Sequence, residues 1–381
     1  MQTGTTSIAS LADLAKPGPC PRLVVKVGSA LLVDADGPRR AWIAALTGEI
    51  AATRARGQDV VVVSSGAIAL GARTLALEKG GRGSLADAQA AAAVGQIALS
   101  GLWAELLGAH GLTAAQLLLT LEDLEDRRRY LNAAATLGRL LDAGAVPVVN
   151  ENDSVATQEI RFGDNDRLAA RVAQAAHASA VLLLSDVDGL YDRNPKEAGA
   201  QLLPVVRGVT ADIHAMADGG SGSGMGSGGM TSKLQAAEIA ERAGIALAIG
   251  NGTKDAPIAR VMEQGIGTLF LPRQKARARQ AWLGGRLRLK GTLAVDSGAA
   301  AALAGGASLL ARGITAVEGE FARGDAVAIR SPEGAVLAHG LSEYDAAECR
   351  RLLGRHSSEH EALLGYSPRS AIVHRDQLVL L

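Results

Sequence analysis

The chain has 381 residues, 39 acidic and 39 basic side chains, and 48% hydrophobic residues. This length predicts more than one domain, and the zero formal net charge argues against a general attraction to nucleic acid or acidic membranes. Cys20 and Cys349 form no CxxC pair, so they indicate neither a disulfide framework nor a cysteine zinc site, and a reducing cytoplasm fits best. No apolar run has the length expected of a membrane span.

Apolar runs alternate with helical patterns over the first 272 residues. Residues 1–21, with three prolines near their end, are predicted to be a flexible leader and not a signal peptide. Continuous apolar strands separated by helices are typical of a parallel sheet covered on both faces, so the predicted fold class is α/β, a three-layer sandwich around a mostly parallel sheet. The predicted strands are 22–27, 59–63, 112–119, 145–149, 180–184 and 245–249, and the predicted helices are 42–56, 89–107, 126–142, 165–177 and 231–243.

The pattern changes after residue 272. Residues 273–290 contain seven lysine or arginine residues and no acidic residue. RNA could bind there, but a solvated basic linker is the better interpretation because the rest of the chain is not basic. We therefore predict a catalytic domain over 22–272, a linker over 273–290 and a small, mainly β domain over 291–381. Its expected strands are 292–295, 314–317, 326–330, 336–339 and 371–373, with a helix around 345–353.

Polar residues follow several of the predicted strands. In an open α/β sheet, ligands bind just beyond the carboxyl ends of the strands. The segments at 26–29, 64–67 and 185–191 are rich in small and polar residues, and NENDSVATQEIRFGDND at 150–166 concentrates carboxylates and amides. The last segment is either a solvated loop or part of an active site, and the neighbouring strand ends favour the active site.

A glycine-rich stretch leads into GGMTSK, which ends at Lys233. Two lysines, Lys26 and Lys233, together with glycines and hydroxyl residues that open helices, are typical of a phosphate site. No Walker A motif is present, and the GxGxxG spacing at 224–229 follows no strand. His356 and His360 lack the HExxH order and are predicted on a surface helix face, so we predict no metal ligands in the protein.

Several motifs carry a resemblance to a known family. They are VVKVGSALL, VSSGAIALG, AAVGQ, RYLNAAATL, VPVVNENDSVATQEIRFGDNDRLAA, LLLSDVDGLYDRNP and GSGGMTSKLQAAEIA, with KGTLAVDSGAAAAL, GITAVEGEFARGD and AHGLSEY in the second domain. Together they resemble the glutamate 5-kinases, members of the amino acid kinase family that carry a C-terminal PUA-like domain. The likeness covers nearly everything after residue 21. The departures, such as GGMTSK where the family often has GGMSTK, keep a hydroxyl group.

The resemblance implies an amino acid kinase fold and an activity. The activity is ATP-dependent phosphorylation of the L-glutamate γ-carboxylate to L-glutamyl 5-phosphate, the first step of proline biosynthesis, with Mg²⁺ as cofactor. It also implies feedback inhibition by proline, a homo-oligomer and contact with glutamyl phosphate reductase, the next enzyme. An acetylglutamate, aspartate or uridylate kinase, or an RNA-binding module, remains an alternative. The PUA-like domain and the NEND segment argue against the other kinases, and the zero net charge argues against RNA.

The resemblance also implies site residues. Ser65, Asp153 and Asn165 would hold glutamate. The ATP site would include Lys26, Ser185 and Asp186 together with Ser227, Gly228, Gly229, Met230, Thr231, Ser232 and Lys233.

The reaction itself places a demand on the site. The acceptor carboxylate is already ionised near pH 7, so catalysis must rely on positioning and on neutralising the charge of two anions. Lys26 and Lys233 suit that role. Asp166 is the candidate to orient both lysines, unless it only caps the helix that follows it.

Overall fold

The computed structural model describes residues 7–155, 164–218, 229–273, 289–366 and 369–380. The chain divides into two compact units. Unit 1 comprises Met1–Glu125 and Ala133–Arg273, and unit 2 comprises Asp126–Asn132 and Gln274–Leu381.

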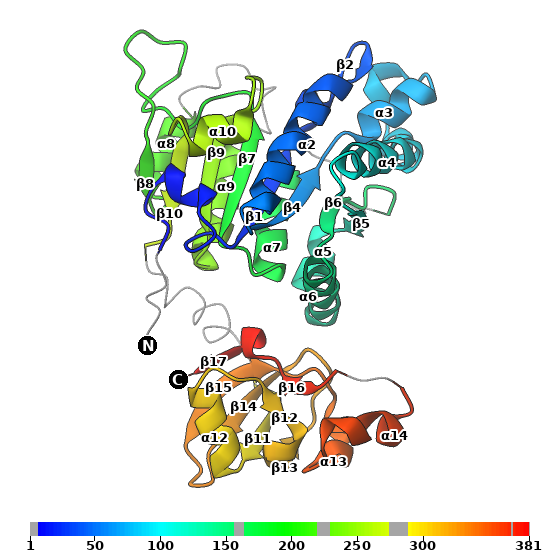
Figure 1. The fold of residues 1–381 in the computed structure, drawn as a ribbon, viewed down its shortest axis with the longest axis vertical. Helices are drawn as coiled ribbons and strands as arrows, with labels where there is room; N and C mark the ends of the chain where they lie inside the picture. Colours follow the sequence, from blue (N-terminus) through cyan, green and yellow to red (C-terminus); the bar gives the residue numbers. More distant parts are fainter. Residues whose placement is uncertain (1–6, 156–163, 219–228, 274–288, 367–368, 381) are drawn as a thin grey trace. The chain divides into compact units, whose positions relative to one another are not determined.

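Unit 1 is built on an eight-stranded sheet with the order β5-β6-β4-β1-β7-β9-β10-β8 (Figure 1). All neighbouring strands are parallel except β9 and β10, which confirms the predicted mostly parallel sheet. Two strands at one edge, β8 and β10, are not in the sequence prediction. The strands are β1 (Arg22–Val27), β4 (Asp59–Ser64), β5 (Ala114–Leu119), β6 (Val146–Glu151), β7 (Ala180–Ser185), β8 (Val205–Arg207), β9 (Ala246–Asn251) and β10 (Thr268–Leu271).

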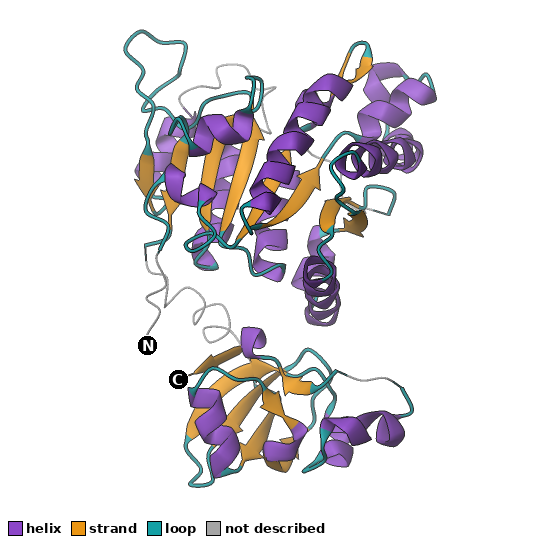
Figure 2. Cartoon of the chain, viewed as in Figure 1, coloured by secondary structure: helices purple, strands orange, loops and turns teal. Residues whose placement is uncertain are grey.

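Helices cover both faces of this sheet, as Figure 2 shows. They confirm the predicted three-layer arrangement, with α2 and α10 over one face and α7 and α9 over the other. The helices before residue 273 are α1 (Ser29–Leu32), α2 (Arg40–Ala55), α3 (Ala67–Thr74), α4 (Leu85–Gly108), α5 (Leu121–Glu125), α6 (Arg127–Asp142), α7 (Asp164–Ala175), α8 (Ala211–Asp218), α9 (Met230–Arg242) and α10 (Pro257–Met262). Two short 3₁₀ helices, η1 (Leu11–Ala15) and η2 (Glu78–Gly81), and the hairpin of β2 (Val33–Asp34) and β3 (Gly37–Pro38) complete this part.

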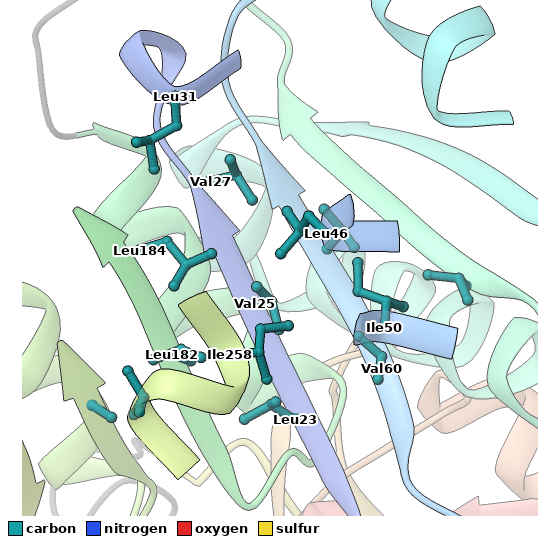
Figure 3. Close-up of a cluster of buried hydrophobic side chains, with 14 of the residues drawn as sticks. Leu23, Val25, Val27, Leu31, Leu46, Ile50, Val60, Leu182, Leu184 and Ile258 are labelled. Carbon is teal, nitrogen blue, oxygen red and sulfur yellow. The ribbon is translucent and has the colours of Figure 1, made fainter. Parts of the chain in front are cut away.

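The central strand β1 has one face for the core and one face for chemistry. Leu23, Val25 and Val27 are fully buried and point toward α2 and α10 (Figure 3). Successive side chains of a strand point to opposite faces, so Val24 and Lys26 face the α7 side of the sheet. Burying each of the aliphatic side chains stabilises the fold by about 1.5–3 kcal/mol, and this fixes the register that places Lys26.

The first described residues are not a loose leader, contrary to the prediction for residues 1–21. Ile8, Leu11 and Leu14 are buried in the main hydrophobic cluster of unit 1. Leu11 and Leu14, three residues apart, lie on one side of the 3₁₀ helix η1, because side chains at i and i+3 eclipse in such a helix. The cluster also buries Cys20, just before β1. The prolines therefore interrupt a packed segment and do not mark an unfolded one.

Among the described residues, helix α4 is long and apolar enough to cross a membrane, by length and composition only. It has 24 residues, and its most apolar 18-residue window has a mean hydropathy of 1.4 and is 44% buried inside unit 1. The helix lies against α3 in backbone contact. A Cβ atom added to Gly95 would lie 1.8 Å from the carbonyl oxygen of Ala67, and one added to Gly71 would lie 1.7 Å from that of Ala91. Alanines and glycines thus make α4 a close-packed helix of the fold.

Unit 2 has its own sheet and core, which confirms the predicted mainly β region. Its five-stranded sheet has the order β13-β11-β14-β15-β17, and β12 pairs with β16. Buried side chains such as Leu293, Ile329 and Tyr344 fill its core. The strands are β11 (Gly291–Val295), β12 (Leu309–Leu310), β13 (Ile314–Gly319), β14 (Ala326–Arg330), β15 (Val336–Leu341), β16 (Ala371–Val373) and β17 (Leu378–Leu380).

The helices of unit 2 correct one prediction from the sequence. His356 and His360 do not share a helix face, because His356 caps the 3₁₀ helix η4 (Ser357–Glu359) and His360 is the first residue of α14. His360 is buried, with 1% of its surface exposed, whereas His356 is exposed. The remaining helices are α12 (Ser297–Ala304), η3 (Ala311–Gly313), α13 (Ala346–Leu352), α14 (His360–Leu364) and η5 (Arg375–Gln377).

Candidate active site

Four neighbouring strands of unit 1 end at the same edge of the sheet. The order β6-β4-β1-β7 is parallel throughout, so the polar segments that follow these strands share the carboxyl edge. Lys26 lies near the end of β1, Ser65 follows β4, and Asn150 and Ser185 lie at the ends of β6 and β7. The topology alone therefore gathers segments that are up to about 160 residues apart in the chain.

A buried carboxylate joins the two lysines. The Nζ atom of Lys26 lies 2.6 Å from Oδ1 of Asp166, and the Nζ atom of Lys233 lies 3.3 Å from Oδ2. The Oγ atom of Ser232 also donates a hydrogen bond of 2.9 Å to Oδ2. The Asp166 side chain is fully buried, and only 9% and 10% of the two lysine side chains are exposed. The structure thus brings together Lys26, Lys233 and Asp166 in one cluster.

This cluster carries a net positive charge. Burial by itself raises the pKa of Asp166, but the charges of Lys26 and Lys233 together with the hydrogen bonds from Lys26 and Ser232 outweigh it. The pKa of Asp166 is therefore lowered, and the group is a carboxylate at neutral pH. Two ammonium groups beside one carboxylate leave one unit of positive charge in a buried place, and each ammonium has three N–H donors. Such a cluster can bind and polarise a phosphate.

Small residues let the two helices that carry this cluster approach each other. Asp166 lies in the first turn of α7, and Ser232 and Lys233 lie in the first turn of α9. The two helices pack against each other, and each has fully buried alanines, such as Ala169 in α7 and Ala236 in α9. A larger side chain at such a buried position would need room that a packed interior does not have.

A second cluster consists of uncharged polar side chains and begins at the residue next to Asp166. The Nδ2 atom of Asn165 donates to Oγ of Ser65 at 2.9 Å and to Oδ1 of Asn150 at 3.3 Å. The Nδ2 atom of Asn150 in turn donates to Oε1 of Gln96 on α4 at 2.9 Å. Among the residues that the structure describes, Oδ1 of Asn165 is buried and has no hydrogen-bond partner. A buried acceptor without a partner is costly unless a ligand supplies the donor.

The other predicted site residues occupy the same edge or lie outside the description. Asp153 is buried. Burial lowers the pKa of Arg82, and the charge of Asp153 partly opposes this effect. Ser185 donates to Oδ1 of the exposed Asp186 at 3.0 Å. Gly229, Met230 and Thr231 lie at the start of α9, whereas Ser227 and Gly228 lie outside the described residues.

Sequence reasoning missed Gln96, Arg82 and the role of Asn150 in this network. Gln96 ends the AAVGQ motif and Asn150 opens the NEND motif, so both stood in segments already singled out. Within the described ranges, no group of three or more His, Cys, Asp or Glu residues could hold a metal ion.

Comparison with known proteins identifies the family of this chain. The amino acid kinase family matches residues 21–251, and the PUA domain matches residues 291–364. The glutamate 5-kinase of Novosphingobium aromaticivorans is 73% identical, covering 98% of this chain and 100% of that protein. The glutamate 5-kinase of Sphingopyxis alaskensis is 62% identical, covering 97% and 100%, and that of Zymomonas mobilis is 52% identical, covering 100% and 96%. The chain therefore belongs to the amino acid kinase family, in the group of glutamate 5-kinases that carry a PUA domain.

Proposed function

We propose that this protein transfers the γ-phosphoryl group of ATP to the γ-carboxylate of L-glutamate. The products are L-glutamyl 5-phosphate and ADP, and the reaction is the first step of proline biosynthesis. The observation that carries the proposal is the buried Asp166 carboxylate that holds the ammonium groups of Lys26 and Lys233 together. The high identity to glutamate 5-kinases over nearly the whole chain supports the same activity.

The chemistry requires charge neutralisation and not a base. A γ-carboxylate oxygen forms a bond to the γ-phosphorus, and the bond from that phosphorus to the oxygen bridging the β-phosphate breaks, so ADP leaves with the electron pair. The glutamate carboxyl group is already ionised near pH 7. The obstacle is repulsion between this anion and the triphosphate, and Lys26 and Lys233 oppose it from two elements. Asp166 holds the ammonium groups of Lys26 and Lys233 in place. Each ammonium group has three N–H donors, so some of them remain for phosphate oxygens.

The start of α9 supports a nucleotide site. Glycine at the N-cap, Gly229, has no side chain that would keep an anion away from the start of the helix, and the N-terminal end of a helix attracts anions. Lys233 lies in the same turn. Mg²⁺ would bind the ATP phosphates and neutralise part of their charge. Ser185 and Asp186 at the end of β7 would complete the nucleotide site.

The second cluster, formed by Ser65, Asn165, Asn150 and Gln96 and called the neutral cluster from here on, suits a free amino acid. We assign glutamate to Ser65, Asn165 and Asp153. The Ser65 oxygen already accepts a hydrogen bond from Asn165, so its own hydrogen is free to donate to a carboxylate. The substrate ammonium needs acceptors, and Oδ1 of Asn165 and the Asp153 carboxylate supply them. Asn165 and Asp166 are adjacent in the chain, which would keep glutamate next to the lysine pair.

Regulation and assembly belong to the same proposal. We propose that proline inhibits the enzyme, that the enzyme is a cytoplasmic homo-oligomer, and that it contacts the reductase that consumes glutamyl phosphate. The family membership supports these points, and each has a direct measurement. Proline should lower the rate at fixed glutamate, and light scattering should give more than one chain per particle.

The decisive experiment measures glutamate-dependent turnover of ATP, with hydroxylamine added to trap glutamyl phosphate as the hydroxamate. Hydroxamate should form with L-glutamate and not with N-acetylglutamate, L-aspartate or UMP as the acceptor. Turnover that depends on one of those acceptors and not on glutamate would refute the proposal.

A further inference from the structure

Hydrogen bonds inside the neutral cluster fix which end of the Asn165 amide can face a ligand. Both hydrogens of the Asn165 amide are in use, one on Oγ of Ser65 at 2.9 Å and one on Oδ1 of Asn150 at 3.3 Å. A primary amide has two N–H donors, so Nδ2 has nothing further to offer. Its oxygen, Oδ1, is buried and has no partner among the described residues. In this orientation Asn165 can only accept a hydrogen bond from a ligand.

The orientation of Asn165 depends on the amides behind it. Asn150 accepts from Asn165 through Oδ1 and donates through Nδ2 to Oε1 of Gln96 at 2.9 Å. If Asn150 were turned over, its Nδ2 would face Nδ2 of Asn165, and Asn165 would turn over as well. The acceptor oxygen of Gln96 is therefore the end of a directional chain of three amides.

Gln96 lies on a helix that cannot easily move. The preceding residue, Gly95, is in backbone contact with α3, since an added Cβ atom would lie 1.8 Å from the carbonyl oxygen of Ala67. About two turns further along α4, the buried Trp103 donates from Nε1 to Oγ of Ser64 at 2.9 Å, at the end of β4. These contacts fix α4 against the carboxyl edge of the sheet. They give the AAVGQ motif a physical role: its Gly95 lets α4 lie against α3, and its Gln96 accepts the hydrogen bond from Asn150.

We propose that Gln96 is a positioning residue for recognition of the substrate ammonium group. Its Oε1 atom holds Asn150 and Asn165 in the one orientation that presents an oxygen, and not an NH₂ group, to a cation. This inference rests on the proposed binding of glutamate by Asn165. It adds that a residue of α4, outside the pocket itself, decides whether the site prefers an amino acid over the matching diacid without the amino group.

The test uses three variants at this position and one control. Gln96→Met keeps the length of the side chain and removes the acceptor, Gln96→Glu keeps an acceptor oxygen, and Gln96→Ala is the second deletion in case the first does not fold. Gln264→Met is the control, because Gln264 is exposed and only its backbone N–H makes a described hydrogen bond. Hydroxamate formation gives kcat and both KM values. Glutarate, which lacks the amino group, serves as a competitive inhibitor.

Gln96→Met and Gln96→Ala should raise the KM for glutamate roughly tenfold to a hundredfold, the loss expected for one hydrogen bond to a charged group. The KM for ATP and the inhibition constant of glutarate should stay within about threefold of the wild type, and Gln96→Glu should recover most of the glutamate affinity. A structural role alone would weaken glutamate and glutarate equally, and that result, or an unchanged KM for glutamate, would overturn the inference. A wild-type enzyme without glutamate-dependent turnover would instead refute the proposed function, and the inference with it.

Discussion

Replacement of Asp166 by asparagine tests the charge cluster most directly. The Asp166→Asn side chain keeps the shape of the carboxylate and removes its charge. The amide oxygen can still accept from one ammonium, but the NH₂ group then faces the other, donor against donor. The contact of 2.6 Å to Lys26 and the contact of 3.3 Å to Lys233 cannot both survive. We expect one lysine to leave the position from which it would bind the migrating phosphoryl group.

The distances set the scale of this loss. At an effective dielectric constant of about 20, unit charges separated by 2.6 and 3.3 Å attract each other by about 6 and 5 kcal/mol. Much of this attraction is offset in the native enzyme by the cost of burying the charges. Losing one transition-state donor costs about 3–4 kcal/mol in other enzymes, which lowers kcat by roughly two to three powers of ten. Since the substrates bind chiefly to other groups, their KM values should change by less than about fivefold.

The assay is hydroxamate formation under saturating ATP and glutamate, and Asp59→Asn is a matched control. Asp59 also lies between two cations, Arg22 and Arg54, but at the amino end of β4 and away from the lysine pair. Asp59→Asn should lower the Tm and leave kcat within about twofold of the wild type, since charge pairs of this partly exposed kind act on stability. A folded Asp166→Asn enzyme with a kcat within threefold of the wild type would refute the role of Asp166.

Three further outcomes follow from the structure. Burial raises the pKa of the Cys20 and Cys349 thiols to about 12. Neither thiol should therefore react with Ellman's reagent at pH 8 until the chain is unfolded. A thiol that reacts at once in the native protein would contradict this burial. The pKa of Asp166 in the folded chain lies below its ordinary value of 3.8. The contribution of this carboxylate to stability is therefore complete above about pH 4 and is lost as the pH falls further. The Tm of Asp166→Asn should fall less steeply below pH 4 than the Tm of the wild type, and equal slopes would count against a buried, charged Asp166. Gly95→Ala should lower the free energy of unfolding by about 1–3 kcal/mol in a urea titration, whereas Gly101→Ala on the same helix, with no atom within 4 Å of the added methyl group, should be neutral or stabilising.

The interior of the sheet could be predicted from the sequence because its strands are buried on both faces. The predicted strand at 22–27 coincides with β1. The predicted strands at 59–63 and 180–184 begin with β4 and β7 and stop one residue before the ends of those strands. Such runs leave no other assignment than a covered parallel strand. The short strands β8 and β10 could not be predicted in the same way, because each has only two or three apolar residues and is flanked by glycine and proline, which usually mark turns and loops. Similarly, η1 shows its apolar side only once the sheet that covers it is known.

The site was predictable as far as chemistry dictates residue types. Lysines near glycines at strand ends indicate phosphate, and amides beside carboxylates indicate a polar ligand. Gln96 could not be predicted, because a glutamine in an alanine-rich helix looks like any residue that faces solvent. Only the contact between Gly95 and the backbone of α3 places it beside Asn150. Information of this kind lies in the packing of two helices and not in any local pattern of residues.

The position of β1 in the middle of the sheet affects how the chain becomes active during synthesis. Its partners β4 and β7 and the helix that carries Lys233 all come later in the chain, and about 200 residues separate Lys26 from Lys233. A ribosome that adds about 5–20 residues per second needs roughly 10–40 s to cover that distance. Until then the nascent chain holds one half of the phosphate site without the other. Polypeptides released before α9 is made should therefore be unable to consume ATP, so that prematurely terminated translation leaves no wasteful ATPase in the cell.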